Sequence, residues 1–322
     1  MNRFNVVVTS PQLAAEAVAV LERVGCALHY LPPYPSGAAV AELAARVQAD
    51  AILARQGPVD AQAIAASPRL RIVARHGVGV DEVDLAAAAA RGVMVTNTPG
   101  ANSVAVAEHT LALILSLVKE IKPLGTRIAA GLWRDPGKGA RDLAGLRLGL
   151  VGCGSIGREV ARRAAVFGMT VAAADPALPP DGLPGIARAA TVLALARDSD
   201  VLSVHVPLTV ATRGLVGAVV LAAMPSGGFV VNTARGGIVD ESALLAALES
   251  GQIAGAALDV FATEPPPLGY ALRDDPRVLA TPHVAGSTPG ALVNMGRAAA
   301  ECIAALLSGG TVPPERVVTR AS

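Results

Sequence analysis

Short apolar runs alternate with longer amphipathic stretches along the first hundred residues. The apolar runs predict strands at 5–8, 27–31, 51–53, 71–74 and 93–95. The amphipathic stretches predict helices at 11–24, 38–48, 61–66 and 83–91. Strands that alternate with helices in this way are typical of a parallel sheet with helices on both faces.

A second series of the same kind follows a long predicted helix at about 102–119. Its strands are expected near 146–151, 170–174, 201–204, 229–232, 256–258 and 278–280, and a helix at 289–307 closes the chain. No Ser/Gly-rich or Pro-rich linker separates two consecutive domains. We therefore predict an α/β protein with two doubly wound parallel-sheet domains: a Rossmann domain at 99–287, inserted into a flavodoxin-like substrate domain at 1–98 plus 288–322.

A glycine-rich segment stands between the first strand and the first helix of that second series. Gly152, Gly154 and Gly157 form G-x-G-x-x-G, and 158–167 predicts the helix behind it. Glycines allow a tight turn and a close backbone approach to a pyrophosphate, whose charge is stabilised at a helix N-terminus. Such a pattern can also be a plain turn, but a flanking strand, helix and second strand favour dinucleotide binding.

Asp175 ends the second strand of this series, eighteen residues after the last glycine. A carboxylate there can accept hydrogen bonds from the ribose hydroxyls of the adenosine, and it would repel a 2′-phosphate. The next residues, Pro-Ala-Leu at 176–178, offer no cation to hold such a phosphate. NAD(H) is therefore expected rather than NADP(H).

Composition narrows the classes of partner. A formal net charge of +1 over 322 residues, without a basic cluster, argues against nucleic-acid binding. Charged residues or glycines interrupt the apolar stretches before they reach membrane-spanning length, so no membrane span is expected. Cys26, Cys153 and Cys302 have no spacing typical of a disulfide framework or a metal site. With no leader segment visible, we expect a cytoplasmic protein without a metal ion.

Three ionisable residues follow predicted strands, at the sheet edge where α/β proteins bind ligands. Arg235 follows the strand at 229–232, Glu264 follows that at 256–258, and His283 follows that at 278–280. Taken singly, each has an ordinary structural explanation: a surface arginine, a glutamate before a proline loop, a polar cap. Together, beside a predicted nicotinamide site, they indicate a catalytic group.

These residue types suit reversible hydride transfer between a 2-hydroxy acid and a 2-keto acid. The hydroxyl proton needs an acid/base that titrates near neutrality, which is the range of histidine. A carboxylate bonded to the other imidazole nitrogen fixes the tautomer, and arginine supplies a planar fork of donors for the substrate carboxylate. The nicotinamide carries the hydride.

From about Arg55 to the last helix, the chain resembles the D-isomer-specific 2-hydroxyacid dehydrogenases, in particular the branch that contains the D-3-phosphoglycerate dehydrogenases. Order and spacing match in seven segments. These are 75–81, 97–109, 152–157, 205–209, 232–236, 259–265 and 281–286. One departure is Cys153, which stands where a bulkier apolar residue is expected. A thiol at a helix N-terminus can be reactive, but a buried, inert cysteine is the favoured interpretation.

The resemblance implies a role for each matching position. Arg235 would bind the substrate carboxylate and polarise the keto oxygen, Glu264 would orient His283, and His283 would donate the proton in reduction. Backbone N–H groups of Gly77, Val78 and Gly79 would cradle the carboxylate, with Val78 also near the nicotinamide. Further cofactor contacts would be Asp259 to the carboxamide, Ser155 and Ile156 to the pyrophosphate, Val206 and Pro207 to the adenosine side, and Thr233, Ala234 and Gly286.

The resemblance also bears on assembly and substrate. The helix after Ala101 and the region of Trp133 would form a homodimer interface. Independently of the resemblance, the predicted insertion requires two chain crossings, near 99–102 and 286–289, whose Gly, Pro, Ser and Asn residues suit hinges for closure over the ligands. The chain ends at Ser322 without the serine-sensing regulatory domain of some phosphoglycerate dehydrogenases, so feedback of that kind is not expected.

For the substrate, D-3-phosphoglycerate is the best single expectation, with Arg55, Arg75 and Arg134 as candidate phosphate ligands. Glyoxylate, hydroxypyruvate and other small 2-keto acids are the alternatives. Two other functions stay open: an NAD-sensing module like the corepressors that share this fold, and formate dehydrogenase. The latter branch has Gln at the position of Glu264.

Overall fold

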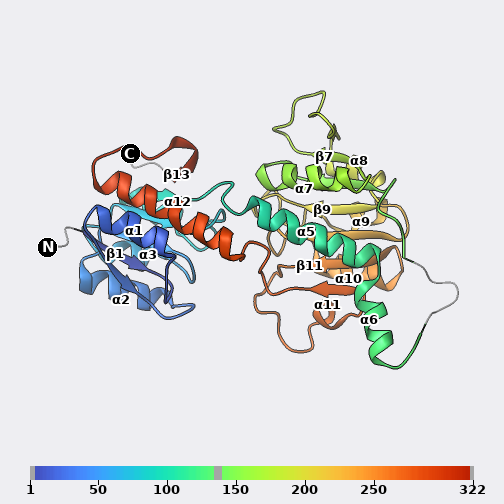
Figure 1. The fold of residues 1–322 in the computed structure, drawn as a ribbon, viewed down its shortest axis with the longest axis horizontal. Coiled ribbons are helices and arrows are strands. Elements are labelled where there is room, and N and C mark those ends of the chain that lie inside the picture. Colours follow the sequence, from blue (N-terminus) through green and yellow to red (C-terminus); the bar gives the residue numbers. More distant parts are fainter. Residues whose placement is uncertain (1–3, 134–139, 320–322) are drawn as a thin grey trace. The chain divides into compact units, whose positions relative to one another are not determined.

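The computed structural model describes residues 4–133 and 140–319 (Figure 1). The chain divides into two compact units. The first unit consists of Met1–Asn102 together with Ser287–Ser322, and the second unit is Ser103–Gly286. The second unit thus lies inside the sequence of the first, and the chain passes between them twice.

The first unit is built on a six-stranded sheet with the order β13-β5-β4-β3-β1-β2. The strands are β1 (Phe4–Val8), β2 (Cys26–Tyr30), β3 (Ala51–Ala54), β4 (Ile72–Arg75), β5 (Met94–Thr96) and β13 (Val317–Thr319). β1 to β5 pair in parallel, whereas β13 pairs antiparallel with β5. The sequence did not predict β13, because none of its three residues is buried and its two valines do not form a longer apolar run.

Helices cover both faces of this sheet. They are α1 (Ala15–Arg23), α2 (Gly37–Val47), α3 (Ala61–Ala65), α4 (Leu85–Ala90) and α12 (Pro289–Leu307), followed by the short 3₁₀ helix η1 (Pro314–Arg316). Side chains alternate along β1: Val6 and Val8 pack with α1 and α12, whereas Val7 packs with α2 and α3. Burial on both faces explains why these strands appear in the sequence as continuous apolar runs.

α12 is the one helix among the described residues that is long and apolar enough to cross a membrane. Half of its apolar window is buried within the structure, and Ala299, Cys302 and Ile303 belong to the core of the first unit. This is the pattern of a core helix in a folded domain.

The second unit carries a seven-stranded, wholly parallel sheet with the order β12-β11-β10-β9-β6-β7-β8. Its strands are β6 (Arg147–Val151), β7 (Thr170–Ala174), β8 (Ala187–Arg188), β9 (Val201–Val204), β10 (Gly228–Asn232), β11 (Ile253–Leu258) and β12 (Val278–Ala280). The chain runs outward from β6 first to one side and then to the other. The predicted fold, two doubly wound sheets of which one is a Rossmann domain, is confirmed, and ligands bind such sheets where the strand order reverses.

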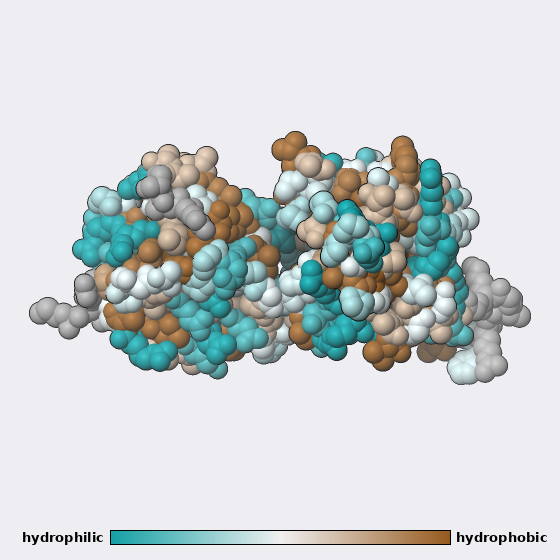
Figure 2. All heavy atoms as spheres, turned by 90° about the horizontal axis from the view of Figure 1, so that it is seen from above, coloured by the Kyte–Doolittle hydropathy of each residue, from teal (hydrophilic) through white to brown (hydrophobic). Residues whose placement is uncertain are grey.

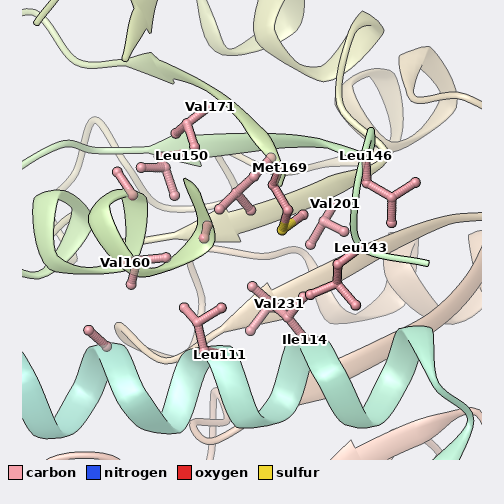
Figure 3. Packing of buried hydrophobic residues seen from close by; sticks show 14 of the residues in the cluster. Leu111, Ile114, Leu143, Leu146, Leu150, Val160, Met169, Val171, Val201 and Val231 are labelled. Atoms are coloured by element: carbon pink, nitrogen blue, oxygen red, sulfur yellow. The ribbon is translucent and has the colours of Figure 1, made fainter. Parts of the chain in front are cut away.

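The helices of the second unit are α5 (Ser103–Val118), α6 (Ile121–Ala129), α7 (Ser155–Val166), α8 (Val192–Arg197), α9 (Ala218–Ala223), α10 (Glu241–Glu249) and α11 (Ala271–Asp274). Figure 3 shows Leu111 and Ile114 of α5 pointing toward Val231, Val201 and Met169, with Val160 of α7 in the same layer. α5 is therefore fixed to the core of the sheet along its buried face.

α6 is a helix that the sequence did not predict, and no residue in it is buried. Ile121, Leu124 and Ile128 are all exposed, as are Leu132 and Trp133 just beyond the helix. Elsewhere, on the face seen in Figure 2, hydrophobic and hydrophilic residues are interspersed.

Candidate functional site

The glycine-rich loop joins β6 to α7, as predicted, and its glycines meet different spatial demands. Gly152 has φ +95°, and a Cβ there would lie 2.7 Å from Val206 Cγ1 and 2.8 Å from the carbonyl oxygen of His205. A Cβ on Gly157 would lie 2.6 Å from the oxygen of Gly152, whereas one on Gly154 would meet nothing within 4 Å. Two glycines are needed for packing, and the third leaves an open backbone, which fits a pyrophosphate.

Asp175 holds this loop as well as ending β7. Its Oδ2 accepts a hydrogen bond from the backbone N–H of Cys153 at 2.8 Å, and Oδ1 accepts one from Ala177 N at 2.8 Å. The sequence predicted a bond to ribose but missed this bracing role. Cys153 itself is buried, and burial raises the pKa of its thiol, in agreement with the inert interpretation.

Glu264 and His283 form a direct pair. Nδ1 of His283 lies 2.7 Å from Oε2 of Glu264, whose Oε1 accepts a hydrogen bond from the Phe261 N–H at 3.0 Å. Burial raises the pKa of Glu264, but the hydrogen bonds from His283 and Phe261 and the charge of Arg235 outweigh it, so that this pKa lies below its usual value. The carboxylate therefore stays ionised and can fix the imidazole orientation.

The end of the preceding strand, β10, shapes the loop that carries Arg235. The side chain of Asn232 donates to the carbonyl oxygen of Arg235 at 2.9 Å and accepts from Ala234 N at 3.0 Å. A Cβ on Gly236 would lie 1.8 Å from the carbonyl oxygen of Phe261, so only glycine lets this loop approach the segment that leads to Glu264. The structure thus brings together the three residues that the sequence proposed as catalytic.

Asp259 is buried, and its carboxylate binds the loop that carries His283. Oδ1 accepts from the Thr281 hydroxyl at 2.6 Å and from Val284 N at 3.0 Å, and Oδ2 accepts from Ala285 N at 2.9 Å. His283 has φ +53°, a left-handed conformation that non-glycine residues rarely adopt, so these bonds hold an unusual backbone in place. The sequence had suggested Asp259 only as a carboxamide ligand.

Arg75, which the sequence suggested as a phosphate ligand, has several structural partners among the described residues. Its guanidinium donates to the carbonyl oxygens of Gly79, Ala54 and Arg55 at 2.7–3.1 Å and pairs with Glu82 at 3.0 Å. The side chain is only 15% exposed. With its donors engaged, Arg75 shapes the following loop and has little capacity for a substrate phosphate.

The loop at Gly77–Gly79 makes its hydrogen bonds to other described residues through its carbonyl groups. Its carbonyl groups accept bonds from Thr98 N, Asn97 Nδ2 and Arg75, but among the described residues no acceptor is recorded for the N–H groups of Gly77, Val78 and Gly79. Three adjacent free amides can bind an anion. Arg55 likewise has no recorded side-chain partner in the described part of the chain, whereas Arg134 lies outside the described residues.

The other predicted cofactor residues lie on the second unit near the carboxyl ends of its strands. Ser155 and Ile156 begin α7, and Val206 and Pro207 follow β9. Thr233 and Ala234 follow β10, and Gly286 ends the unit. Their contacts with a cofactor remain predictions, as does that of Val78 in the first unit. Within residues 4–133 and 140–319, no three His, Cys, Asp or Glu side chains gather in a way that could hold a metal ion.

Comparison with known proteins gives a consistent result. The family model described as D-isomer specific 2-hydroxyacid dehydrogenase, NAD binding domain, matches residues 111–285. A D-3-phosphoglycerate dehydrogenase of Mycobacterium leprae is 43% identical over 279 residues, which are 84% of this chain and 52% of the relative. The chain spans about half the length of the phosphoglycerate dehydrogenases of this kind that it matches.

The match with this chain covers a larger share of a shorter relative and of a solved structure. The hydroxypyruvate reductase of Thermotoga maritima is 40% identical over 240 residues, 74% of this chain and 78% of the relative. The crystal structure of a 2-hydroxyacid dehydrogenase from Ketogulonicigenium vulgare superposes with a TM-score of 0.84 and 32% identity over the full length of both chains.

Proposed function

Since this chain belongs to the D-isomer specific 2-hydroxyacid dehydrogenase family, we propose that it is an NAD-dependent enzyme that interconverts a small D-2-hydroxy acid and the corresponding 2-keto acid. The observation that carries the proposal is the Glu264–His283 hydrogen bond of 2.7 Å, formed close to Arg235. An oriented imidazole beside a guanidinium is the arrangement that proton transfer to a keto acid requires.

Each of these side chains has a defined part in the reaction. Glu264 accepts the bond from Nδ1 and so directs Nε2 of His283 toward the substrate oxygen, to which it gives a proton in reduction and from which it takes one in oxidation. Arg235 binds the substrate carboxylate through its planar fork and polarises the keto group. NADH bound at the glycine-rich loop would supply the hydride.

The best single substrate remains D-3-phosphoglycerate. Relatives of that name match most of this chain, the side chain of Arg55 has no hydrogen-bond or ion-pair partner among the described residues, and the amides of Gly77–Gly79 suit an anionic group. Hydroxypyruvate and glyoxylate are the alternatives, because a relative named hydroxypyruvate reductase matches nearly as well and a small substrate would need no further cation.

The test is NADH oxidation with 3-phosphohydroxypyruvate, hydroxypyruvate and glyoxylate. We expect turnover, and we expect His283→Ala to lower it by roughly 10²–10⁴-fold while NADH binding is nearly unchanged, because only the proton donor is lost. Arg55→Ala should raise KM for the phosphorylated substrate far more than for glyoxylate, and Arg55→Lys should restore part of the loss. An equal effect of Arg55→Ala on both substrates would assign the enzyme to the small keto acids.

An NAD-sensing module similar to the corepressors is the candidate from another class. It predicts NADH binding without turnover of any keto acid in the panel, an outcome that would overturn the proposed activity. Formate oxidation is disfavoured by Glu264, because the transfer of a hydride from formate requires no proton relay.

We also propose a homodimer, for which the exposed apolar side chains of α6 and Trp133 provide a surface. Analytical sedimentation of the unmodified protein and of the Ile128→Asp variant tests the proposed dimer. The unmodified protein should sediment as a dimer and the variant as a monomer, because the interface would have to bury the new charge.

A further inference from the structure

His109 of α5 contacts the loop that carries His283. Its Nε2 lies 3.1 Å from the hydroxyl oxygen of Thr281, which stands two residues before His283. The Thr281 hydroxyl donates to Oδ1 of Asp259 at 2.6 Å, so its oxygen is left to accept a hydrogen bond from the imidazole. His109 thereby ends a chain of hydrogen bonds that runs through Thr281 and Asp259 to the N–H groups of Val284 and Ala285.

Thr110, the next residue of α5, contacts the loop that carries Arg235. Its hydroxyl oxygen lies 2.9 Å from that of Thr233, which stands two residues before Arg235, and both threonines are buried. Because the Thr110 hydroxyl donates to the carbonyl oxygen of Val106 at 2.8 Å, the bond between the threonines takes its proton from Thr233.

Helix geometry explains how adjacent residues reach two different loops. Successive side chains of an α-helix point about 100° apart, and the two loops follow β10 and β12, which are separated by β11. On the same helix, Leu111 and Ile114 are buried in the core. The helix is thus a fixed reference to which both loops are tied.

We propose that His109 and Thr110 are positioning residues that set the placement of His283 and Arg235 relative to each other. This inference rests on the proposed function of those two side chains. His109 acts on the proton donor, by stabilising a loop in which His283 has a left-handed backbone. Thr110 acts on the carboxylate ligand. Neither touches the reacting atoms.

The kinetic test uses the different signatures that these two roles imply. His109→Ala and Thr281→Val should lower kcat by about 10- to 100-fold with little change in KM, because misplacement by about 1 Å can cost about 10²-fold. Thr110→Val should chiefly raise KM for the keto acid. The conservative variants His109→Gln, Thr281→Ser and Thr110→Ser keep the hydrogen bonds and should recover most of the loss. Glu108→Gln, an exposed change on the same helix, serves as the control.

Hydrogen exchange gives a readout that needs no activity. In His109→Ala and Thr281→Val, the amides of Val284 and Ala285 should exchange about tenfold or more faster, whereas amides of the first unit should not change. If the variants lower kcat and raise KM in the same proportion, or if the exchange of Val284 and Ala285 is unaltered, the positioning role is refuted. Absence of turnover in the unmodified protein would refute the proposed function instead, and the exchange experiment would still test this inference.

Discussion

Gly236 allows a quantitative test of how closely the loop that carries Arg235 must approach the segment that leads to Glu264. In Gly236→Ala the new Cβ would lie 1.8 Å from the carbonyl oxygen of Phe261 and 2.5 Å from Ala262 N. These neighbours are backbone atoms, which cannot turn aside as a flexible side chain could. Ordinary contact begins at 3.4 Å, so the loops must separate by about 1.6 Å, and Arg235 must move away from the Glu264–His283 pair.

A shift of that size has a large expected effect on catalysis. Misplacement by about 1 Å can cost about 10²-fold in rate, so kcat/KM should fall at least about 100-fold, equivalent to about 2.7 kcal/mol of transition-state stabilisation. The assay is steady-state NADH oxidation with the best keto acid, together with NADH fluorescence titration and thermal unfolding to confirm binding and folding.

Gly290→Ala is the matched control, since a Cβ there would meet nothing within 4 Å and the backbone is not left-handed. It should retain the activity of the unmodified protein. A folded Gly236→Ala protein with unchanged kcat/KM would refute the idea that close approach of these loops places Arg235.

Three further outcomes are expected. Arg235→Lys should lose nearly as much kcat/KM as Arg235→Ala, because an ammonium group cannot reproduce the planar fork, and a Lys variant with most of its kcat/KM would contradict the bidentate role. Asp175→Asn should reduce the ratio of kcat/KM for NADH to kcat/KM for NADPH, because it removes the charge that repels a 2′-phosphate but keeps an oxygen that can accept the bond from Cys153 N. Equal use of both cofactors by the unmodified enzyme would contradict this role of Asp175. Burial lowers the pKa of His76 and of His205 from 6.5 to about 4, so between these pH values the unfolded state binds more protons than the folded state. The free energy of unfolding should therefore fall as the pH drops from 6.5 to 4, by roughly 1.4 kcal/mol per pH unit for each histidine. Thermal unfolding at several pH values should show a smaller dependence of stability on pH in His205→Gln than in the unmodified protein. The same dependence in both proteins would exclude His205 as its source.

Local patterns were sufficient for the fold and for the identity of the chemical groups. Apolar runs located every strand of four or more residues, and G-x-G-x-x-G located the loop between β6 and α7, because these signals depend on neighbours in the sequence. β8, β13, α6 and the helices α8 to α11 were not located. β8 and β13 have no buried residue and so lack the apolar run that marks the other strands, and the exposed apolar side of α6 lacks the buried core contacts on which the prediction of an amphipathic helix depends.

What each polar group does was decided only by the tertiary structure, since its partners come from distant parts of the chain. Arg75 has the residue type of a phosphate ligand, yet its donors are taken by carbonyl groups of β3 and the next loop, and Asp259 holds the His283 loop through a hydroxyl and two amides. Gly236 looks like any loop glycine until the backbone of Phe261 is placed against it. Residue types determined which reactions were available to this protein, whereas contacts between segments far apart in sequence determined which side chains are held ready for them.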